Sequence, residues 1–368
     1  MAMSFRPLVV IKSKMGEFEA LRHLIDRGVA TPRVLVELLD SIQWDGRGQL
    51  LQSLVKAATQ MAARQQPLWI DSHLLSPSAS LARHPGGSFE QLDNRIESAL
   101  LDEYGLLAPD VPAFIPVVTA SAADDELRAV AMLQEHRPRP IVIRFRNLGV
   151  SARELDDGVR RVIRATRADK NLSHAIVDLG FVETVQLRQV RAAVWLAQAV
   201  LDRLAPQSIT LLAGSIPATR HGFATTVRDR PEVPLWLEVA HGINGAEINY
   251  GDYGVVHPNA PRAGSPGPRT VYPYLYYTVP NCVIAMRRQP AKEFGNVAPG
   301  AAGKAFGELA GELVARPEFA GSNFSWGDGE LARCRSGRDR AASSVSRWVA
   351  YATSHHLEHV AQRGTSGL

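Results

Sequence analysis

Short apolar runs recur along the first two thirds of the chain at intervals of roughly thirty residues, about the length of one strand–helix–strand unit. Most are separated by stretches in which apolar residues return with helical spacing. The runs predict eight strands, at residues 8–12, 34–38, 68–71, 114–119, 141–145, 175–179, 209–213 and 248–256. Because strands that alternate with helices form parallel sheets, and eight of them favour closure, the pattern predicts an α/β fold with a (β/α)8 TIM-like barrel.

Capping residues add detail to the helices between these strands, which are expected from residue 16, at 49–63, 88–103 and 124–134, from residue 151, and at 184–204. Ser88 is the expected N-cap of the third helix. Asp124 and Asp125 open the fourth, where carboxylates favour the positive end of the helix dipole. Ser151 and Glu154 have the spacing of a capping box, which predicts the start of the fifth helix.

The pattern changes after the eighth strand. Residues 258–268 are rich in Pro and Gly and predict an exposed loop, while 271–277 and 283–287 predict a hairpin. A helix up to residue 316 and a final helix around Trp348 and His355 follow. With 368 residues the chain is longer than a bare barrel requires. The expected organisation is a barrel at 1–257 and a C-terminal extension at 258–368, packed on the barrel and not an independent domain.

Composition narrows the class of protein. The apolar content of 45% and the charged content of 21% are ordinary for a soluble globular protein. There is no apolar run long enough for a membrane span and no apolar signal core near the N-terminus, so a cytoplasmic protein is expected. Cys282 and Cys334 are expected to be reduced thiols. A net charge of +4 does not by itself indicate a nucleic-acid binder.

Several ordered segments resemble the beta family of phage and bacterial proteins. The resemblance rests on residues 7–21, Val36-Glu37, 177–180, 213–217, 250–253, 324–328 and 354–357. It implies a single (β/α)8-type barrel and a role in phage–host conflict, while the family name is a label and implies no chemistry. The family pattern would place an Arg before Tyr277-Thr278, where this chain has Tyr276, so a role for such an Arg is not expected here.

Charged and small polar residues stand at the C-terminal ends of many predicted strands, where a barrel builds its site. Lys12 and Lys14 share strand parity, so both are expected on one face of the first strand. Either lysine could hold a phosphate or carboxylate, or act as an amine nucleophile, including Schiff-base formation. The alternative is that Lys12 forms a salt bridge with Glu37 on the neighbouring strand.

Three carboxylates end three different predicted strands, namely Glu37, Asp71 and Asp178. Oxygen ligands converging on one rim could bind Mg²⁺, or two carboxyl groups could act as general acid and base. The alternative is charge balance against Arg144 and Arg146 inside the barrel mouth. The cofactor is therefore open, with Mg²⁺ as the candidate.

Arg144 and Arg146 also share parity, and a guanidinium fork suits a two-point contact with phosphate or carboxylate. Gly214-Ser215 follows the seventh strand, where barrels commonly bind a phosphate on backbone N–H groups. The alternative for Gly214-Ser215 is a simple turn. Lysine, paired arginines and a small-residue loop on one rim together favour an anionic ligand.

Two loops place an Asp beside Gly and an aromatic residue, at Asp252-Tyr253 and at Trp326-Gly-Asp328. The aromatic residue could stack a base or sugar while the Asp accepts a hydrogen bond, or the Asp could cap its own loop. His355 and His359 have the i, i+4 spacing of a zinc pair, and His356 could reach the rim. The alternative is a helix that packs on the barrel.

These features predict a phosphate-bearing ligand, either a nucleotide or a nucleic-acid end, at the C-terminal rim of the barrel. As an enzyme, the protein would hydrolyse it with Lys12, Glu37, Asp71 and Asp178 as catalytic residues. Ligand binding would use Lys14, Arg144, Arg146, Gly214, Ser215, Asp252, Tyr253, Trp326, Asp328 and His356. The alternative is a sensor or effector module without turnover, which binds a nucleotide, nucleic acid or phage protein. Whether the protein is an enzyme stays open at this point, and no membrane partner is expected.

Overall fold

The computed structural model describes residues 6–44, 48–220, 222–259, 272–294, 296–335, 344–363 and 368, and it contains a closed barrel of eight parallel strands. The strands follow one another around the barrel and β9 closes it against β1. They are β1 (Leu8–Lys12), β2 (Arg33–Glu37), β3 (Trp69–Asp71), β4 (Ile115–Thr119), β5 (Val142–Phe145), β6 (His174–Phe181), β7 (Ser208–Gly214) and β9 (Ile248–Asp252). The predicted fold class and all eight strands are confirmed.

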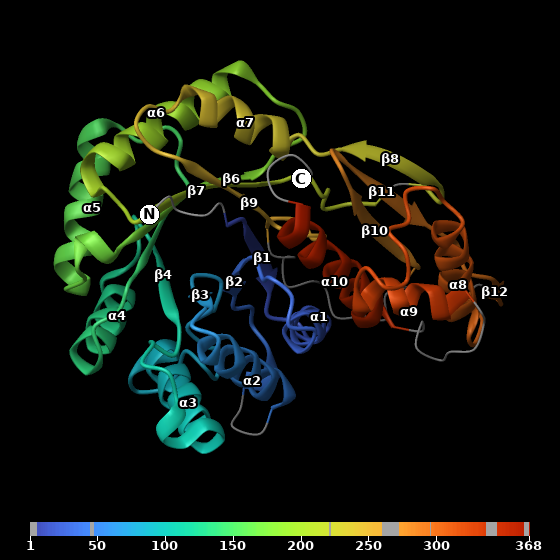
Figure 1. The fold of residues 1–368 in the computed structure, drawn as a ribbon, viewed down its shortest axis with the longest axis horizontal. Helices are drawn as coiled ribbons and strands as arrows, with labels where there is room; N and C mark the ends of the chain where they lie inside the picture. The colour runs from blue at the N-terminus through green and yellow to red at the C-terminus, as the bar shows by residue number, and fades with distance from the viewer. Residues whose placement is uncertain are drawn as a thin grey trace. The chain divides into compact units, whose positions relative to one another are not determined.

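Helices follow the barrel strands and each packs against the next (Figure 1). They are α2 (Gln49–Ala63), α3 (Gly87–Tyr104), α4 (Asp124–His136), α5 (Ala152–Thr166), α6 (Leu187–Leu204) and α7 (Glu232–Gly242), with short 3-10 turns η1 (Ile42–Trp44), η2 (Gly105–Leu107) and η3 (Lys170–Leu172). The capping box of Ser151 and Glu154 is confirmed. The N-cap prediction for Ser88 is wrong, because α3 begins one residue earlier and its N-cap is Gly86, without a side-chain bond.

The chain divides into two compact units. The barrel unit comprises Met1–Ser13, Arg33–Gly214 and Pro231–Tyr253, and the second unit comprises Lys14–Pro32, Ser215–Arg230 and Gly254–Leu368. The expected boundary at residue 257 stays a prediction, and the second unit also includes two segments that precede it in the chain. That the extension packs on the barrel and is not an independent domain stays a prediction.

The second unit contains a three-stranded antiparallel sheet and four helices among the described residues. The predicted hairpin is present as β10 and β11, and β8 adds to its edge. The elements are α1 (Met15–Asp26), β8 (Thr225–Asp229), β10 (Tyr274–Val279), β11 (Cys282–Arg287), β12 (Lys292–Glu293), β13 (Asn296–Val297), α8 (Ala301–Val314), α9 (Trp326–Arg335) and α10 (Val345–Arg363). Helix α1 follows β1 in the chain, yet it packs on α9 and α10.

Alternating residues of the barrel strands fill the barrel interior with apolar side chains. This interior layer includes Val10, Leu35, Trp69, Val142 and Ile176, all of them buried. Because side chains alternate between the two faces of a strand, the residue two positions further along each strand also points inward. The next inward layer, at the C-terminal ends of the strands, is where the charged residues lie.

Two further sequence predictions concern the Pro/Gly-rich loop and membrane spans. Most of the predicted Pro/Gly-rich loop, residues 260–268, lies outside the described residues. Among the helices that the structure describes, none combines the length and the hydropathy that a membrane span requires.

Candidate functional site

Because side chains alternate between the two faces of each strand, five charged residues point into one layer next to the apolar interior of the barrel. Lys12, Glu37, Asp71, Arg144 and Asp178 each stand two positions after an interior residue of the same strand. The parallel register pairs Lys12 with Glu37, and Glu37 with Asp71, across three neighbouring strands. The sequence prediction that these side chains converge at one end of the barrel agrees with this geometry.

Arg144 is the centre of the cluster and its side chain is fully buried. One guanidinium nitrogen, Nη1, lies 2.6 Å from Asp71 Oδ2 and 2.8 Å from Glu37 Oε1. On its other side Nε donates to Asp178 Oδ2 at 3.0 Å. Three carboxylates from β2, β3 and β6 therefore share one guanidinium, which fixes their positions around the barrel axis.

Arg146 follows the end of β5 and lies in an outer layer of the same cluster. Its Nε donates to Asp178 at 3.0 Å and its Nη2 to Glu37 at 3.1 Å. Its side chain is 36% exposed, whereas that of Arg144 is 0% exposed. Arg146 is therefore the cation of this cluster that a ligand from solvent can reach.

His73 connects Arg146 to Asp71 and was not among the predicted site residues. Its Nδ1 lies 2.6 Å from Asp71 Oδ1, and its Nε2 contacts Arg146 Nη1. This pattern fits a neutral imidazole that donates to the carboxylate and accepts from the guanidinium. The signal in the sequence is its position, two residues after Asp71 at the strand end.

Lys12 forms a buried ion pair with Glu37, which is the alternative that the sequence left open for this lysine. Its ammonium group also lies 5.2 Å from the centre of the Tyr253 ring. Tyr253, directly after β9, donates its hydroxyl to Asp178 at 2.7 Å and accepts from Arg144 at 2.6 Å. Tyr253 thus closes the cluster from the last strand of the barrel.

Opposite charges keep Asp71, Asp178 and Arg144 ionised in spite of their burial. Burial opposes ionisation of Asp71, but the hydrogen bond from His73 and the charge of Arg144 outweigh it and hold the pKa of this carboxyl well below its usual value. Burial likewise opposes ionisation of Asp178, while Arg144 and Arg146 lower its pKa. The pKa of Arg144 stays well above its usual value despite burial, because Tyr253 and the three carboxylates surround it. The cations Lys12, Arg144 and Arg146 balance these three carboxylates in formal charge.

Glu126 is a second residue that the sequence did not single out as part of the site. It lies in the first turn of α4, and its carboxyl oxygen Oε1 is buried without a hydrogen-bond partner among the described residues. Burial, together with the charges of Asp71 and Asp125, raises the pKa of Glu126 to about 7. A carboxyl group with such a pKa can take up and release protons near neutrality.

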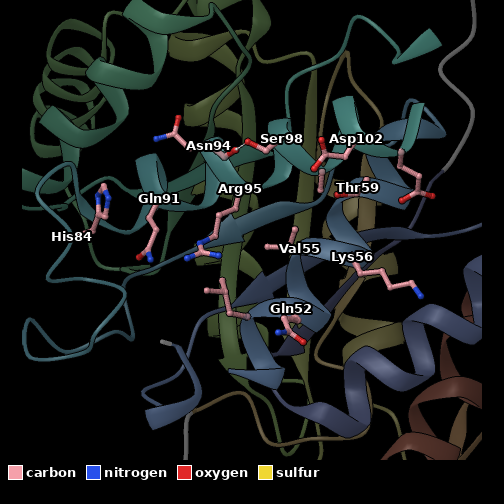
Figure 2. A pocket seen from close by; sticks show the side chains of 13 residues that line it. Gln52, Val55, Lys56, Thr59, His84, Gln91, Asn94, Arg95, Ser98 and Asp102 are labelled. Carbon is pink, nitrogen blue, oxygen red and sulfur yellow. Dashed lines mark hydrogen bonds between the residues drawn. The ribbon is translucent and has the colours of Figure 1, made fainter. Parts of the chain in front are cut away.

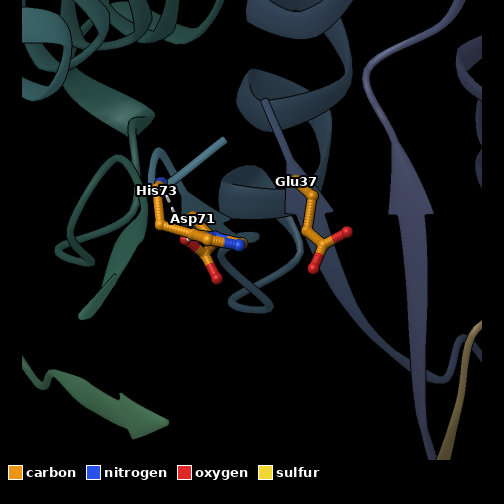
Figure 3. A group of neighbouring side chains, drawn as sticks. All are labelled: Glu37, Asp71 and His73. Carbon is orange, nitrogen blue, oxygen red and sulfur yellow. Dashed lines mark hydrogen bonds and ion pairs between the residues drawn. The ribbon is translucent and has the colours of Figure 1, made fainter. Parts of the chain in front are cut away.

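Glu37, Asp71 and His73 can also be considered as metal ligands (Figure 3). Their donor atoms lie within 4.8 Å of one another. The imidazole makes the donor set suit Mn²⁺ or Zn²⁺ as well as the predicted Mg²⁺. Both carboxylates are already paired with cations, so a metal ion would have to replace ion pairs to Lys12, Arg144 or Arg146. The Mg²⁺ prediction stays a prediction.

Two predicted ligand-binding residues of the barrel unit lie apart from this network. Asp252 accepts a hydrogen bond from Tyr250 at 2.7 Å, and Tyr250 stacks edge-on against Trp236 of α7. The Asp252 side chain therefore shares the strand face that is turned to the helices and away from the barrel mouth. Gly214 ends β7 and pairs with Phe181, and its carbonyl accepts from Val182 N at 2.9 Å.

The remaining predicted residues belong to the second unit, namely Lys14, Ser215, Trp326, Asp328 and His356. Lys14 is exposed and is the N-cap of α1. Strand β1 ends at Lys12, so the parity that was expected to place both lysines on one face does not extend to Lys14. Ser215 is buried.

Asp328 is the centre of a buried polar network inside the second unit. It accepts hydrogen bonds from Tyr277 at 2.8 Å and from Ser325 at 2.6 Å, and His355 Nδ1 lies 2.9 Å from it. The other ring nitrogen of His355 lies 2.7 Å from the carbonyl oxygen of Thr278. Both ring nitrogens of His355 are therefore engaged, which favours the packing alternative over a zinc pair of His355 and His359.

Trp326 and His356, which were also predicted to bind ligand, both contact other residues of the second unit. Trp326 stacks on His23 with ring centres 3.9 Å apart, so one indole face is covered. His356 Nδ1 lies 2.8 Å from the Thr278 hydroxyl. The hydrogen-bond partners of the Asp328 carboxylate among the described residues are side chains of the second unit, so capping of its own loop does not describe it, and its ligand contact stays a prediction.

A closed barrel of eight parallel strands, with a compensated charge cluster at their carboxyl ends, defines this chain as an α/β-barrel protein with a candidate site in the position usual for the fold. The family model described as Beta protein matches residues 6–362, so the chain belongs to that family. The predicted family resemblance is confirmed.

Other comparisons add little. No curated protein matches the chain. A solved structure from Coccidioides immitis, assigned as a fructose-1,6-biphosphate aldolase, is similar over 67% of this chain and 76% of its own, at 14% identity and a TM-score of 0.30. At that level of similarity nothing about the function of this chain follows.

Proposed function

We propose that the mouth of the barrel binds the phosphate group of a nucleotide or of a nucleic-acid end. The observation that carries this proposal is Arg146, a guanidinium that is held at the mouth by Asp178 and Glu37 and is still 36% exposed. A guanidinium fixed in this way needs little reordering to meet an oxyanion. Arg144 and Lys12 lie behind it, and each is already paired with a carboxylate of the cluster.

The reaction class that suits these groups is hydrolysis of a phosphate ester. Water would add to phosphorus, the ester P–O bond would break, and the departing oxygen would take a proton. Glu126 can supply or accept that proton because burial and nearby carboxylates raise its pKa to about 7. Arg146 would stabilise the charge that develops on the phosphoryl oxygens. The predicted catalytic residues Lys12, Glu37, Asp71 and Asp178 would then orient Arg144 and Arg146 and stay out of bond making.

A second candidate is a sensor that binds the same ligand without turnover. The observation in its favour is the saturation of the cluster, since Lys12, Arg144 and Arg146 each already contact a carboxylate. A bound anion would then replace carboxylates in some of these ion pairs, and this rearrangement would be the signal. A role in phage–host conflict, which rests on the family resemblance, and a cytoplasmic location belong to the proposal for either candidate.

Ligand-linked thermal stabilisation tests the binding step, with sulfate and orthophosphate as probes. The full chain is expected to gain melting temperature with either anion, and Arg146→Gln is expected to lose that gain. Arg153→Gln, which removes an exposed guanidinium of α5, is the matched control and should keep it. The proposal fails if neither anion stabilises the protein, or if Arg146→Gln responds as the wild type does.

Turnover separates the two candidates. Bis(p-nitrophenyl) phosphate, assayed with and without EDTA, would release p-nitrophenol if the site is hydrolytic. Glu126→Gln should abolish that release while it keeps the thermal response to sulfate. Anion binding without release of p-nitrophenol would favour the sensor, and loss of release on chelation would favour a metal at Glu37, Asp71 and His73.

A further inference from the structure

A groove runs between helices α2 and α3 on the barrel unit, and the proposed function makes no use of it (Figure 2). Its volume is about 730 Å³, within the range of ligand-binding clefts. Its lining includes polar side chains from both helices, Gln52, Lys56 and Thr59 from α2, and Gln91, Asn94 and Arg95 from α3. We infer that this groove binds an extended acidic peptide segment of a partner protein.

The groove is long enough for a short extended peptide. On α3 the lining residues extend from Gln91 to Glu103, and twelve residues at the rise of an α-helix span about 18 Å. An extended peptide advances about 3.3 Å per residue, so the groove accommodates about five residues. A peptide would fill that length, whereas a single phosphate or sulfate would fill only one end.

Two buried oxygen atoms of the groove lining have no hydrogen-bond partner among the residues that the structure describes. Thr59 is 1% exposed, and neither its hydroxyl oxygen nor the side-chain oxygen of Gln91 has a hydrogen-bond partner in the described part of the chain. Buried polar atoms without partners are uncommon because each costs free energy. Backbone N–H groups of a bound peptide would satisfy both oxygens, and the amides of Gln52 and Asn94 can pair with peptide groups in the same way.

Two cations of the groove lining are available to an acidic ligand. Lys56 and Arg95 face this groove, and the described residues include no carboxylate within salt-bridge distance of either. Such cations complement an acidic side chain of a ligand. Asp102 and Glu103 line the end near the C-terminus of α3, so the acidic residue of the peptide is expected close to Arg95.

Exposed apolar residues favour a protein partner over a small molecule. Directly after α3, Leu106 and Leu107 are 105% and 88% exposed, and Leu101 of α3 is 63% exposed. Apolar side chains gathered in this way on one helix end are typical of surfaces that contact another protein. The peptide would thus be part of a larger interface that includes this apolar end.

Selection from a phage-displayed library of random dodecapeptides on the immobilised full chain tests the inference. Peptides that carry Asp or Glu are expected to be enriched, and Lys56→Glu and Arg95→Glu are each expected to weaken their binding at least tenfold. Lys170→Glu, an exposed lysine outside the groove, is the matched control and should bind as the wild type does. No enrichment over the bare surface, or enriched peptides that bind the charge-reversed variants equally well, would overturn the inference.

Thr59→Val gives a readout that a purely structural role would not produce. Valine keeps the shape and removes a hydroxyl that has no partner in the free protein, so the melting temperature without peptide should be unchanged or higher. Peptide binding should nevertheless weaken, by about fivefold for one lost hydrogen bond. Tighter, Arg95-dependent binding of a labelled oligothymidylate than of any selected peptide would assign the groove to nucleic acid and contradict the inference.

Discussion

Arg144 Nη1 lies 2.6 Å from Asp71 Oδ2, with both side chains buried inside the barrel and 73 residues apart in the chain. The same nitrogen also meets Glu37, so one guanidinium joins carboxylates from two neighbouring strands. Arg144 thereby converts three separate strand ends into one rigid site.

Arg144→Met should destabilise the protein by about 3 to 5 kcal/mol, because it leaves three buried carboxylates without their shared cation. The free energy of unfolding in guanidinium chloride measures the effect. Arg153→Met, which alters an ion pair whose arginine is 93% exposed, is the control and should change stability little. Equal stability of Arg144→Met and wild type would mean that the carboxylates do not depend on this guanidinium.

Asp71 should make stability sensitive to acid. Its pKa in the folded protein lies well below its usual value, so its stabilising contribution is fully present above the unfolded-state pKa of about 3.9. That contribution is lost as pH falls from about 4 towards the folded-state pKa. Asp71→Asn should therefore lose less stability than wild type between pH 5 and pH 2.5, relative to each protein's own value at pH 7. Parallel curves for the two proteins in urea unfolding experiments would contradict the assignment.

Glu126 should have the opposite pH dependence. Its pKa is raised to about 7 in the folded protein, against about 4.3 when unfolded, so ionisation favours the unfolded chain as pH rises. Glu126→Gln should therefore gain melting temperature relative to wild type between pH 5 and pH 8, with the difference levelling off above that. Glu183→Gln, at an exposed glutamate, is the control and should follow wild type. A constant difference across this range would show that Glu126 is ionised throughout.

Tyr277→Phe probes the network around Asp328 in the second unit. The change removes a hydroxyl that donates to Asp328 at 2.8 Å and accepts from Ala320 N at 2.9 Å. The loss should be about 1 to 3 kcal/mol, since buried partners are left unsatisfied. Tyr272→Phe is the control, because phenylalanine keeps the ring contact to Phe223. Calorimetry should find a lower melting temperature for Tyr277→Phe, and no difference between the two variants would sink the prediction.

Alternation of apolar and polar residues determined the barrel and the end at which its charges gather. Lys12, Glu37, Asp71, Arg144 and Asp178 could be found from the sequence because each continues the inward parity of its strand. That argument requires a continuous strand. Strand parity does not apply to Lys14, because this residue lies beyond the end of β1. Asp252 lies on the face of β9 that is turned away from the barrel mouth.

Loop and helix residues of the site could not be predicted in this way. His73 follows β3 and reaches Asp71 through a local turn, and Glu126 belongs to an acidic run that reads as an ordinary helix start. Strand β8 was also missed, because its residues are largely exposed and Val227 is 58% exposed, so no apolar alternation marks it. Each of these features depends on contacts with neighbouring segments that leave no local pattern.

The sequence by itself determined the fold class, the family, and which strand ends carry charge, because side-chain alternation and helical spacing are local properties of the chain. Only the tertiary structure decided that Arg144 stands between Glu37, Asp71 and Asp178, and that Arg146 remains the exposed cation. It also decided that α1 groups with α9 and α10. The physical reason is that pairing among several equally suitable charges depends on barrel closure and register, which bring together residues distant in sequence.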